Sequence, residues 1–306
     1  MRVAIIGRTE ILYDTALLLR ASGHQIVCIL TAKEAPEYRR GVEDFRLLAE
    51  QWTIPFANSA RILEYRDFLA QAQADIAVSI NYSGVIPEDV TALFPFGILN
   101  AHGGDLPRYR GNACQAWAIL NGEEKIGLCI HRMIGGELDS GDIIVRDYLV
   151  IDLTTKVTRV LEWIGLRTPQ LMLEALQLLS ADPEYVLERQ STDPLKILRC
   201  YPRKPEDGRI DWTKPAIYII RLINACNKPY AGAFCSYEGE KLVIWEAELI
   251  DDGEFFCAIP GQVTKIGDEM IEVACGTGKV RIYHVEMNGQ SATPRTWIQS
   301  IRKRLE

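Results

Sequence analysis

The chain has 306 residues, of which 48% are hydrophobic and 25% charged, as is ordinary for a soluble globular protein. Its 34 basic and 41 acidic residues give a net charge of −7, which argues against a protein that grips a large nucleic acid through a basic surface. No apolar run reaches the roughly 18 residues of a membrane span. The sequence passes from Met1 straight into a strand-like segment without a signal peptide, so we expect a cytoplasmic protein.

The eight cysteines are scattered along the chain, and none forms a Cys-x-x-Cys pair. Most of them stand in apolar runs, which favours buried free thiols in a reducing compartment over a disulfide framework or a metal site. A dense basic cluster at residues 302–304 is expected at the end of a last helix, where cations are favourable.

Strand-like and helix-like segments alternate through the first half of the chain. Apolar runs predict buried strands, and apolar residues at helical spacing predict the helices between them. The expected strands span residues 2–7, 25–31, 74–80 and 96–100, and the expected helices span residues 9–23, 42–52 and 62–73. Such alternation predicts an α/β fold with a mostly parallel sheet. The first strand ends at a single glycine, Gly7, so the three-glycine turn that cradles the pyrophosphate of NAD or FAD is absent from the sequence.

The pattern changes in the second half of the chain. Residues 127–133 and 142–151 resemble paired strands around a glycine-rich turn, and residues 157–180 form one long helix or two shorter ones. Residues 182–212 are irregular and rich in proline, as expected of a linker that crosses the surface. A helix at 214–226 and short strands at 231–239, 240–250, 261–267, 270–276 and 279–287 predict a small antiparallel sheet or barrel. We expect a first domain at 1–200, including the linker from residue 183 onward, and a second domain at 201–306.

Asn100 and His102 stand in the run NAHGGDLPRYRGN, directly after a predicted strand. Ligands of parallel α/β sheets collect beyond the carboxyl ends of the strands, so both side chains are expected at that edge. Asp139 lies in the glycine-rich turn. An amide can stabilise an oxyanion, an imidazole can move protons near neutral pH, and a carboxylate can orient and charge that imidazole. These three residues are therefore candidates for an acyl-transfer site.

The run from Asn100 to Asn112, together with ELDSGDIIV at residues 137–145, resembles the formyltransferase family that uses 10-formyltetrahydrofolate. This family includes methionyl-tRNA formyltransferase and the nucleotide-sugar N-formyltransferases, and its pattern is Asn-x-His-Gly-x-x-Leu-Pro-x-x-Arg-Gly followed by a catalytic Asp. The sequence PEDGRIDW at residues 205–212 is similar to the segment that opens the family's C-terminal domain, so the resemblance covers nearly the whole chain. It implies a Rossmann-like catalytic domain followed by a small β-rich domain similar to an OB fold.

The resemblance also implies a reaction, in which an amine attacks the formyl carbon of the folate. Asn100 would hold the developing oxyanion, His102 would manage the protons, and Asp139 would orient and charge His102. In this reaction 10-formyltetrahydrofolate is a co-substrate, and no metal is expected. The residues that match folate-contact positions of the family are Gly84, Val85, Ile86, Asn112, Gly135, Gly136, Glu137, Leu138 and Asp139.

The chain departs from the family pattern in three places. Gly104 stands where a serine is usual, Asp105 stands where an apolar residue is common, and the turn before Asp139 is one residue longer. The first change removes a hydroxyl, the second adds a negative charge near the site, and the third affects the contacts to the pterin. His131, on a predicted strand, is interpreted as a packed or hydrogen-bonded histidine rather than a catalyst.

Two branches of the family differ in the amine that they formylate. The tRNA enzymes resemble one another in a basic insertion after the second strand, but residues 31–45 here hold three basic and four acidic residues and offer no net positive face to phosphates. The run at residues 227–245 is more similar to the Pro-Tyr-x-Gly-Ala-Phe run of the nucleotide-sugar enzymes. We therefore expect an amino-sugar nucleotide as the acceptor and no nucleic-acid or membrane partner. Methionyl-tRNA, another small amine, hydrolysis by water and a homodimer stay open. The expected acceptor contacts are Tyr82, Arg108, Arg110, Arg203, Trp212 and Tyr230.

Overall fold

The computed structural model describes residues 1–35 and 38–306, and the chain divides into two compact units. The first unit holds Met1–Cys114, Ile126–Leu149 and Glu162–Cys200, and the second holds Gln115–Lys125, Val150–Leu161 and Tyr201–Glu306. The proposed domain limits stay 1–200 and 201–306. The second unit also includes Gln115–Lys125 and Val150–Leu161, which the sequence pattern does not reveal. Among the described residues, no helix combines the length and apolar character needed to cross a bilayer.

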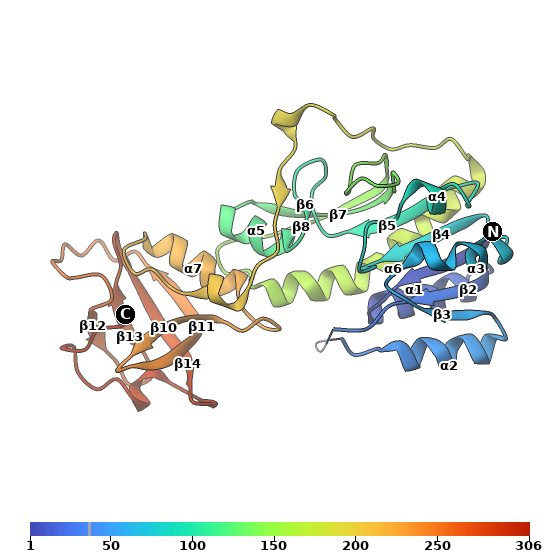
Figure 1. The fold of residues 1–306 in the computed structure, drawn as a ribbon. Coiled ribbons are helices and arrows are strands. Elements are labelled where there is room, and N and C mark those ends of the chain that lie inside the picture. Colours follow the sequence, from blue (N-terminus) through green and yellow to red (C-terminus); the bar gives the residue numbers. More distant parts are fainter. Residues whose placement is uncertain (36–37) are drawn as a thin grey trace. The chain divides into compact units, whose positions relative to one another are not determined.

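A seven-stranded sheet forms the centre of the first unit (Figure 1). Its strand order is β3-β2-β1-β4-β5-β7-β8, in which the first five strands are parallel and β7 runs antiparallel to β5. The predicted mostly parallel α/β sheet is confirmed, and the short strand β3 was not predicted. The strands are β1 (Arg2–Gly7), β2 (Gln25–Thr31), β3 (Phe56–Asn58), β4 (Ile76–Ile80), β5 (Ile98–His102), β7 (Lys125–Arg132) and β8 (Ile143–Val150).

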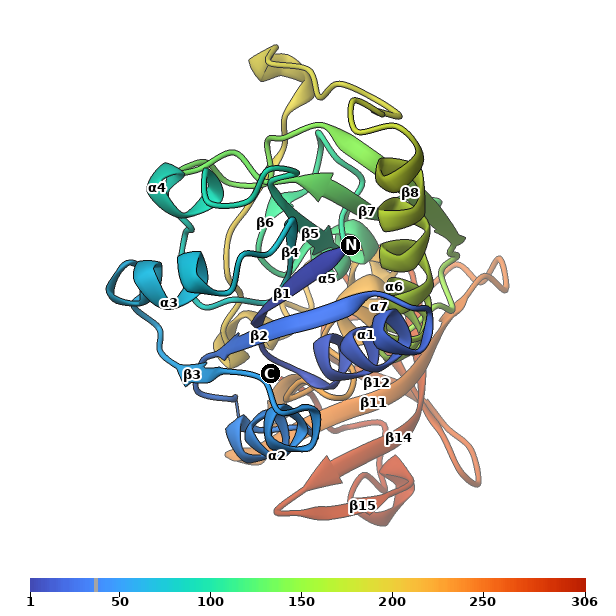
Figure 2. The ribbon, with the colours of Figure 1, turned by 90° about the vertical axis from the view of Figure 1, so that its right-hand side faces the viewer.

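Helices cover both faces of this sheet, with α1 on one face and α3 and α4 on the other (Figure 2). The helix α6 lies on the side of α1, since a methyl group placed on its Gly165 would be 4.0 Å from Ile11 Cγ1. The segment expected as a third helix begins as a 3₁₀ turn, Ile62–Tyr65, before α3, and the segment 157–180 is one long helix with Pro169 inside it. The helices are α1 (Glu10–Ala21), α2 (Val42–Trp52), α3 (Arg66–Gln71), α4 (Glu88–Thr91), α5 (Cys114–Asn121) and α6 (Val157–Ala181).

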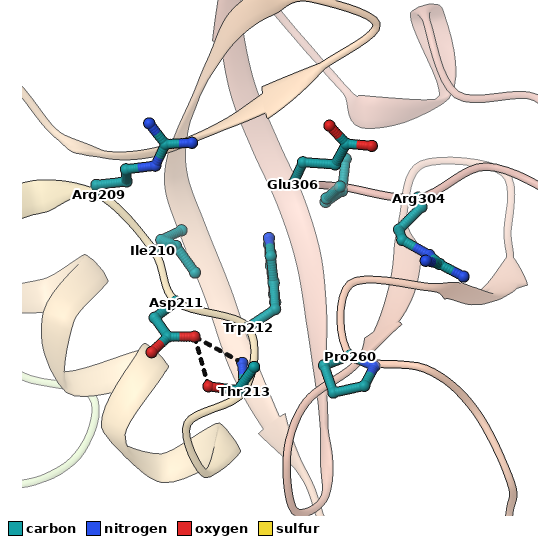
Figure 3. A pocket seen from close by; sticks show the side chains of 9 residues that line it. Arg209, Ile210, Asp211, Trp212, Thr213, Pro260, Arg304 and Glu306 are labelled. Atoms are coloured by element: carbon teal, nitrogen blue, oxygen red, sulfur yellow. Dashed lines mark hydrogen bonds between the residues drawn. The ribbon is translucent and has the colours of Figure 1, made fainter.

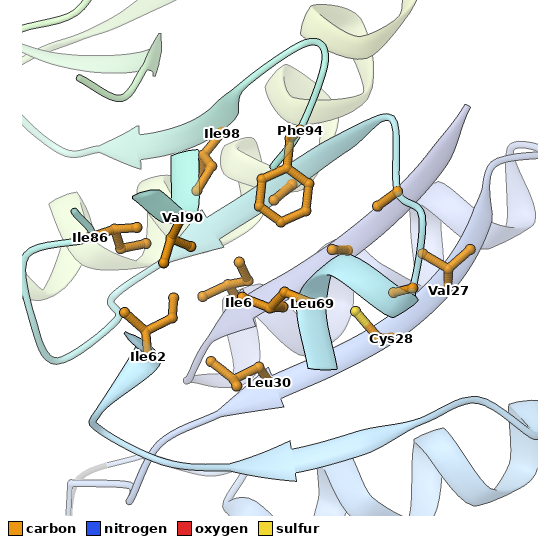
Figure 4. Close-up of a cluster of buried hydrophobic side chains, with 14 of the residues drawn as sticks. Ile6, Val27, Cys28, Leu30, Ile62, Leu69, Ile86, Val90, Phe94 and Ile98 are labelled. Carbon is orange, nitrogen blue, oxygen red and sulfur yellow. The ribbon is translucent and has the colours of Figure 1, made fainter. Parts of the chain in front are cut away.

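The central strands are apolar along their whole length because both faces of the sheet are covered. Alternate residues of a strand point to opposite faces, so Ala4 and Ile6 of β1 face the cluster that contains Leu69 and Val90, while Val3 and Ile5 face the other way. All four of these β1 side chains are fully buried. Figure 4 shows how side chains from β1, β2 and β5 meet Leu69 of α3 and Val90 of α4 in this core cluster.

The second unit is built on a six-stranded sheet in the order β10-β11-β14-β13-β12, with β15 paired to β14. Every pairing in it is antiparallel, as the sequence predicts. Only the short β15 was not expected. The elements are α7 (Ala216–Ala225), β10 (Ala233–Tyr237), β11 (Glu240–Ile250), β12 (Val263–Ile266), β13 (Ile271–Ala274), β14 (Lys279–Met287), β15 (Gln290–Ala292) and a 3₁₀ turn at Pro294–Thr296.

The prediction of a last helix at residues 302–304 is wrong. Arg302 ends a turn instead, and the backbone of Lys303–Leu305 is hydrogen-bonded to the segment that leads into β12. The N–H of Val263 donates to the carbonyl oxygen of Lys303, and the N–H of Leu305 donates to that of Gly261. The segment is too short to gain as many hydrogen bonds within a helix.

Residues 182–212, expected as a surface linker, contain short ordered pieces. Two 3₁₀ turns, Pro194–Lys196 and Pro205–Gly208, flank the strand β9 (Arg199–Cys200), which pairs in parallel with β6 (Arg110–Gly111). This pairing fixes the end of the NAHGGDLPRYRGN run against a segment almost ninety residues further along the chain.

The cysteines are all free thiols, and seven of the eight are buried. The exception is Cys257, which is exposed in the segment between β11 and β12. Within the described part of the chain, no group of three or more His, Cys, Asp and Glu side chains could hold a metal ion.

Candidate functional site

Asn100 and His102 lie on β5 itself, which begins and ends two residues later than the predicted strand. Because β7 runs antiparallel to β5, His131 is directly opposite Asn100. Side chains of directly opposed residues stand on the same face of a sheet and within contact distance of each other. The amide Nδ2 of Asn100 is accordingly 3.1 Å from Nε2 of His131, and the His131 side chain is 1% exposed.

Asp139 brings its carboxylate between the two histidines. Its Oδ2 is 3.5 Å from Nδ1 of His102, and its Oδ1 is 3.6 Å from Nε2 of His131. The backbone N–H of Gly111 donates to Oδ2 at 2.9 Å. The structure therefore brings together Asn100, His102 and Asp139, the three residues that the sequence singled out, and adds His131 as a fourth member of the cluster.

The hydrogen bonds of His102 fix where its proton sits. Its Nε2 is 2.7 Å from the carbonyl oxygen of Tyr109, which can only accept, so Nε2 carries the proton of the neutral ring. The other nitrogen, Nδ1, faces the Asp139 carboxylate. A second proton on this imidazole would therefore be held at Nδ1, beside a negative charge.

Burial and charge set the resting ionisation of this pair. Burial lowers the pKa of His102, and the nearby Asp139 carboxylate opposes that shift only in part. Burial of Asp139 by itself disfavours its charged form, but His102, His131 and the N–H of Gly111 outweigh this and hold the pKa of Asp139 well below its usual range. At neutral pH the site pairs a neutral imidazole with a carboxylate, so His102 is ready to accept a proton at Nδ1.

The lowered pKa of His102 predicts a loss of stability in mild acid. An unfolded histidine has a pKa of about 6.5, so below about pH 6.5 the unfolded chain binds more protons than the folded one and the free energy of unfolding falls. Asp139 contributes little in this window, because its depressed pKa places the loss of its contribution at much lower pH. Urea unfolding of the first unit at about pH 7.5 and about pH 5.5 measures this dependence.

The matched control for this measurement is His24, whose pKa is also lowered by burial and by the charge of the N-terminus but which lies outside the cluster. His102→Gln should flatten the pH dependence more than His24→Gln does. Equal slopes for the wild type and His102→Gln would contradict the assignment of a neutral, buried His102.

The two segments expected to contact the folate lie against each other. The N–H of Gly136 donates to the carbonyl oxygen of Ile86 at 2.9 Å. A Cβ placed on Gly135 would be 2.3 Å from Cα of Glu88, so only glycine allows this close approach. Ile86 is buried and Val85 is 56% exposed. The contact joins the 84–86 segment to the turn that ends at Asp139.

The remaining predicted folate residues are placed as follows. Gly84 and Glu137 are exposed and Leu138 is half-buried. Asn112 is exposed, and its backbone N–H donates to the carbonyl oxygen of Cys200.

Three of the expected acceptor contacts belong to the first unit. The hydroxyl of Tyr82 donates to the carbonyl oxygen of Ser59 at 2.9 Å, and burial raises the pKa of Tyr82 to about 12. Arg108 is exposed, with its guanidinium 5.3 Å from the centre of the Tyr109 ring. Arg110 donates from Nη2 to Oε1 of Gln190 at 2.8 Å.

The other three, Arg203, Trp212 and Tyr230, belong to the second unit. The guanidinium of Arg203 lies 4.9 Å from the centre of the Trp117 ring, and Tyr230 is 41% exposed. Trp212 is only 4% exposed, so it is a core residue of this unit that leaves little ring area for stacking on a base. It borders a pocket of about 450 Å³ within the second unit, between Arg209, Asp211 and Arg304 (Figure 3).

The two departures near His102 have local structural explanations. A Cβ on Gly104 would be 2.5 Å from the carbonyl oxygen of Tyr109 and 2.6 Å from Nε2 of His102, so no side chain fits there. The negative charge of Asp105 is balanced by Arg146 of β8, whose Nη1 lies 3.1 Å from Asp105 Oδ1. The same guanidinium donates to the carbonyl oxygen of Leu106 at 2.7 Å. Asp105 thus fastens the loop to the sheet.

Family models match almost the whole chain. A model described as formyl transferase matches residues 1–176, and a model described as formyl transferase, C-terminal domain, matches residues 203–302. Among curated relatives, the methionyl-tRNA formyltransferase of Geotalea uraniireducens is 29% identical over 298 residues, which are 95% of this chain and 91% of that protein. The methionyl-tRNA formyltransferase of Caldanaerobacter subterraneus subsp. tengcongensis is 28% identical, over 94% of this chain and 93% of its own length.

Several solved structures share the fold. An N-formyltransferase from Helicobacter canadensis, in complex with folinic acid and dTDP-3-aminofucose, has a TM-score of 0.70 at 16% identity and covers 93% of this chain and 99% of its own. The sugar 3N-formyl transferase WlaRD, solved with dTDP and 5-N-formyl-THF, has a TM-score of 0.68 at 17% identity, with 95% and 98% covered. HypX from Aquifex aeolicus in complex with tetrahydrofolic acid has a TM-score of 0.61 at 17% identity, with 97% and 46% covered.

Proposed function

The chain belongs to the formyl transferase family and is a formyltransferase, and we propose that it carries the formyl group of 10-formyltetrahydrofolate to the primary amine of a nucleotide-linked amino sugar. The observation that supports the reaction is the cluster of Asn100 and His102 on β5 with Asp139 in the turn between β7 and β8. The tetrahydrofolate compounds bound to neighbours of the same fold support the folate as formyl donor.

In the proposed reaction the amine nitrogen attacks the formyl carbon, and the carbonyl oxygen becomes an oxyanion. Asn100 donates one amide N–H to that oxyanion, while its other N–H is held by Nε2 of His131. His102 takes the proton lost by the amine at Nδ1, where Asp139 stabilises the resulting imidazolium. The bond from the formyl carbon to the folate nitrogen then breaks, and His102 returns the proton to that nitrogen.

The acceptor is proposed from charge. Binding of tRNA requires cations that are free to replace the counterions of its phosphates. In the described part of residues 31–45, both arginines are instead paired with carboxylates. Arg39 lies 3.3 Å from Glu10, and Arg40 lies 2.8 Å from Asp44. With a net charge of −7 for the whole chain, this supports a small acceptor whose diphosphate needs few positive contacts. Arg108 and Arg110 are the proposed contacts in the first unit.

A second candidate acceptor is methionyl-tRNA. It is favoured by the names of the curated relatives, which are 26–29% identical to this chain over nearly its full length.

Folate-dependent formylation of a panel of amino-sugar nucleotides, with formylatable methionyl-tRNA alongside, separates the two candidates. We expect formylation of at least one amino-sugar nucleotide and no measurable binding of tRNA at about 0.15 M salt, because the chain has a net charge of −7 and both arginines of residues 31–45 are paired with carboxylates. Reactions without the folate are the control. Formylation of tRNA that weakens steeply with salt, with every sugar inert, would establish the second candidate instead.

A further inference from the structure

Gln190 connects two loops of the site. Its side-chain Nε2 donates to the carbonyl oxygen of Asp139 at 2.9 Å and to that of Gly141 at 2.6 Å. Its Oε1 accepts from Nη2 of Arg110 at 2.8 Å. One side chain thus holds the backbone of the turn that carries Asp139 and a residue of the loop that follows His102.

The chemistry of the three partners leaves Gln190 a single orientation. Two of its neighbours are carbonyl oxygens, which only accept, and the third is a guanidinium, which only donates. The amide nitrogen must therefore face the carbonyls and the amide oxygen must face Arg110. An amide is the one side-chain group of this size that supplies two donors and an acceptor at once, so neither a carboxylate nor an apolar group can make all three bonds.

The backbone of the segment before Gln190 is itself fixed to the sheet. The N–H groups of Leu187 and Glu188 donate to the carbonyl oxygen of Ile143 at 2.9 and 3.2 Å. The N–H of Ile143 donates to the backbone carbonyl oxygen of Glu188 at 2.9 Å. Glu188 also lies 3.1 Å from Arg146, the residue that holds Asp105. Gln190 therefore projects from an anchored strand edge.

Asp139 needs such support because of its backbone. Its φ is 50°, in the left-handed region that is unfavourable for residues other than glycine. Its carboxylate is oriented by the N–H of Gly111, which follows Arg110 directly. Gln190 thus holds both partners of the hydrogen bond between Gly111 and Asp139. It binds the backbone of Asp139 directly, and through Arg110 it binds the loop that contains Gly111.

We propose that Gln190 is a positioning residue for formyl transfer, which holds the Asp139 carboxylate against Nδ1 of His102 without touching the reacting atoms. This inference rests on the proposed function, since the reaction that it serves is formyl transfer. It assigns a role to a residue of the irregular segment at 182–212.

Two substitutions at Gln190 test its three hydrogen bonds. Gln190→Leu removes all three, and Gln190→Glu keeps an acceptor for Arg110 but places a carboxylate against the carbonyl oxygens of Asp139 and Gly141. Both variants should lower kcat by about tenfold or more, as expected when a catalytic group shifts by about an ångström. Gln190→Glu, which keeps a partner for Arg110, should also leave KM for the acceptor within about twofold of wild type. The control is Gln177→Leu, the same substitution at an exposed position of α6, which should leave kcat and thermal stability unchanged.

A second measurement follows His102 directly in the protein without substrates. The ring ¹⁵N shifts of His102 should titrate at lower pH in both Gln190 variants than in the wild type, because the carboxylate that favours the imidazolium has moved away. Wild-type kcat in Gln190→Glu, or an unchanged His102 titration in both variants, would overturn the proposal. If the wild type formylates no acceptor, the proposed function fails, and the His102 titration alone still decides whether Gln190 positions Asp139.

Discussion

Replacing His102 by alanine will lower the turnover of formyl transfer by about 100- to 10,000-fold, the range for loss of a general acid–base group. The loss follows from the geometry, because His102 holds the imidazole nitrogen that faces Asp139 at 3.5 Å, and both side chains are at most 10% exposed. Asp139→Asn should also lower turnover, because it removes the charge that stabilises the imidazolium. It keeps the shape of the side chain, so the loss reports on the charge. Steady-state kcat, measured as release of tetrahydrofolate with a working acceptor, is the quantity to compare.

The folate dissociation constant should change little in the His102 variant, because the proposed folate segments at 84–86 and 135–138 are held by backbone hydrogen bonds that do not involve this side chain. His24→Ala, a histidine outside the site, is the control and should keep full activity. Turnover within about threefold of wild type in His102→Ala would exclude His102 as the acid–base group.

Asn100→Ala is expected to lower kcat by about 100- to 1,000-fold, the usual cost of removing one donor to an oxyanion. The Asn100 amide is held by a buried histidine at 3.1 Å, so its second N–H has a fixed direction before substrate binds. Asn100→Asp should be at least as impaired, because a carboxylate would repel the developing negative charge. The measurement is the single-turnover rate constant at saturating folate, with the exposed Asn58→Ala as the control.

Loss of acceptor or folate binding with an unchanged single-turnover rate constant at saturation would assign Asn100 to binding and contradict its role toward the oxyanion. The two substitutions at Asn100 and His102 are not expected to be additive, since both residues act in the same step and share the His131–Asp139 network.

The regular parts of the fold could be predicted from the sequence because their physical signals are local. The strand at residues 2–7 is a continuous apolar run, and the helix at 42–52 shows its buried residues at helical spacing. Short elements carry too few residues for such a signal. The strand Phe56–Asn58 exists because it pairs with β2, and residues 303–305 form no helix because they pair with the segment before β12.

The candidate site also contains residues that could be predicted from the sequence and residues that could not. Asn100, His102 and Asp139 could be singled out because their residue types and spacing match a family pattern. The proximity of His131 depends on the register between β5 and β7, which pairs it with Asn100 and which no local pattern reveals. Gln190 lies in a segment without periodicity, so its three hydrogen bonds could be found only in the folded structure.

The native cysteines of this chain can report local unfolding, because their thiols differ in exposure. Cys257 is exposed, whereas the other seven thiols are buried, four in the first unit and three in the second. Burial raises the pKa of Cys28 and of Cys235 to about 12, so at neutral pH these groups are almost wholly in the unreactive thiol form. An alkylating reagent therefore marks Cys257 at once, and it marks Cys28 and Cys235 only when the structure around them unfolds. Peptide mapping of the marked sites would then show, without any engineered label, which unit of the enzyme opens first.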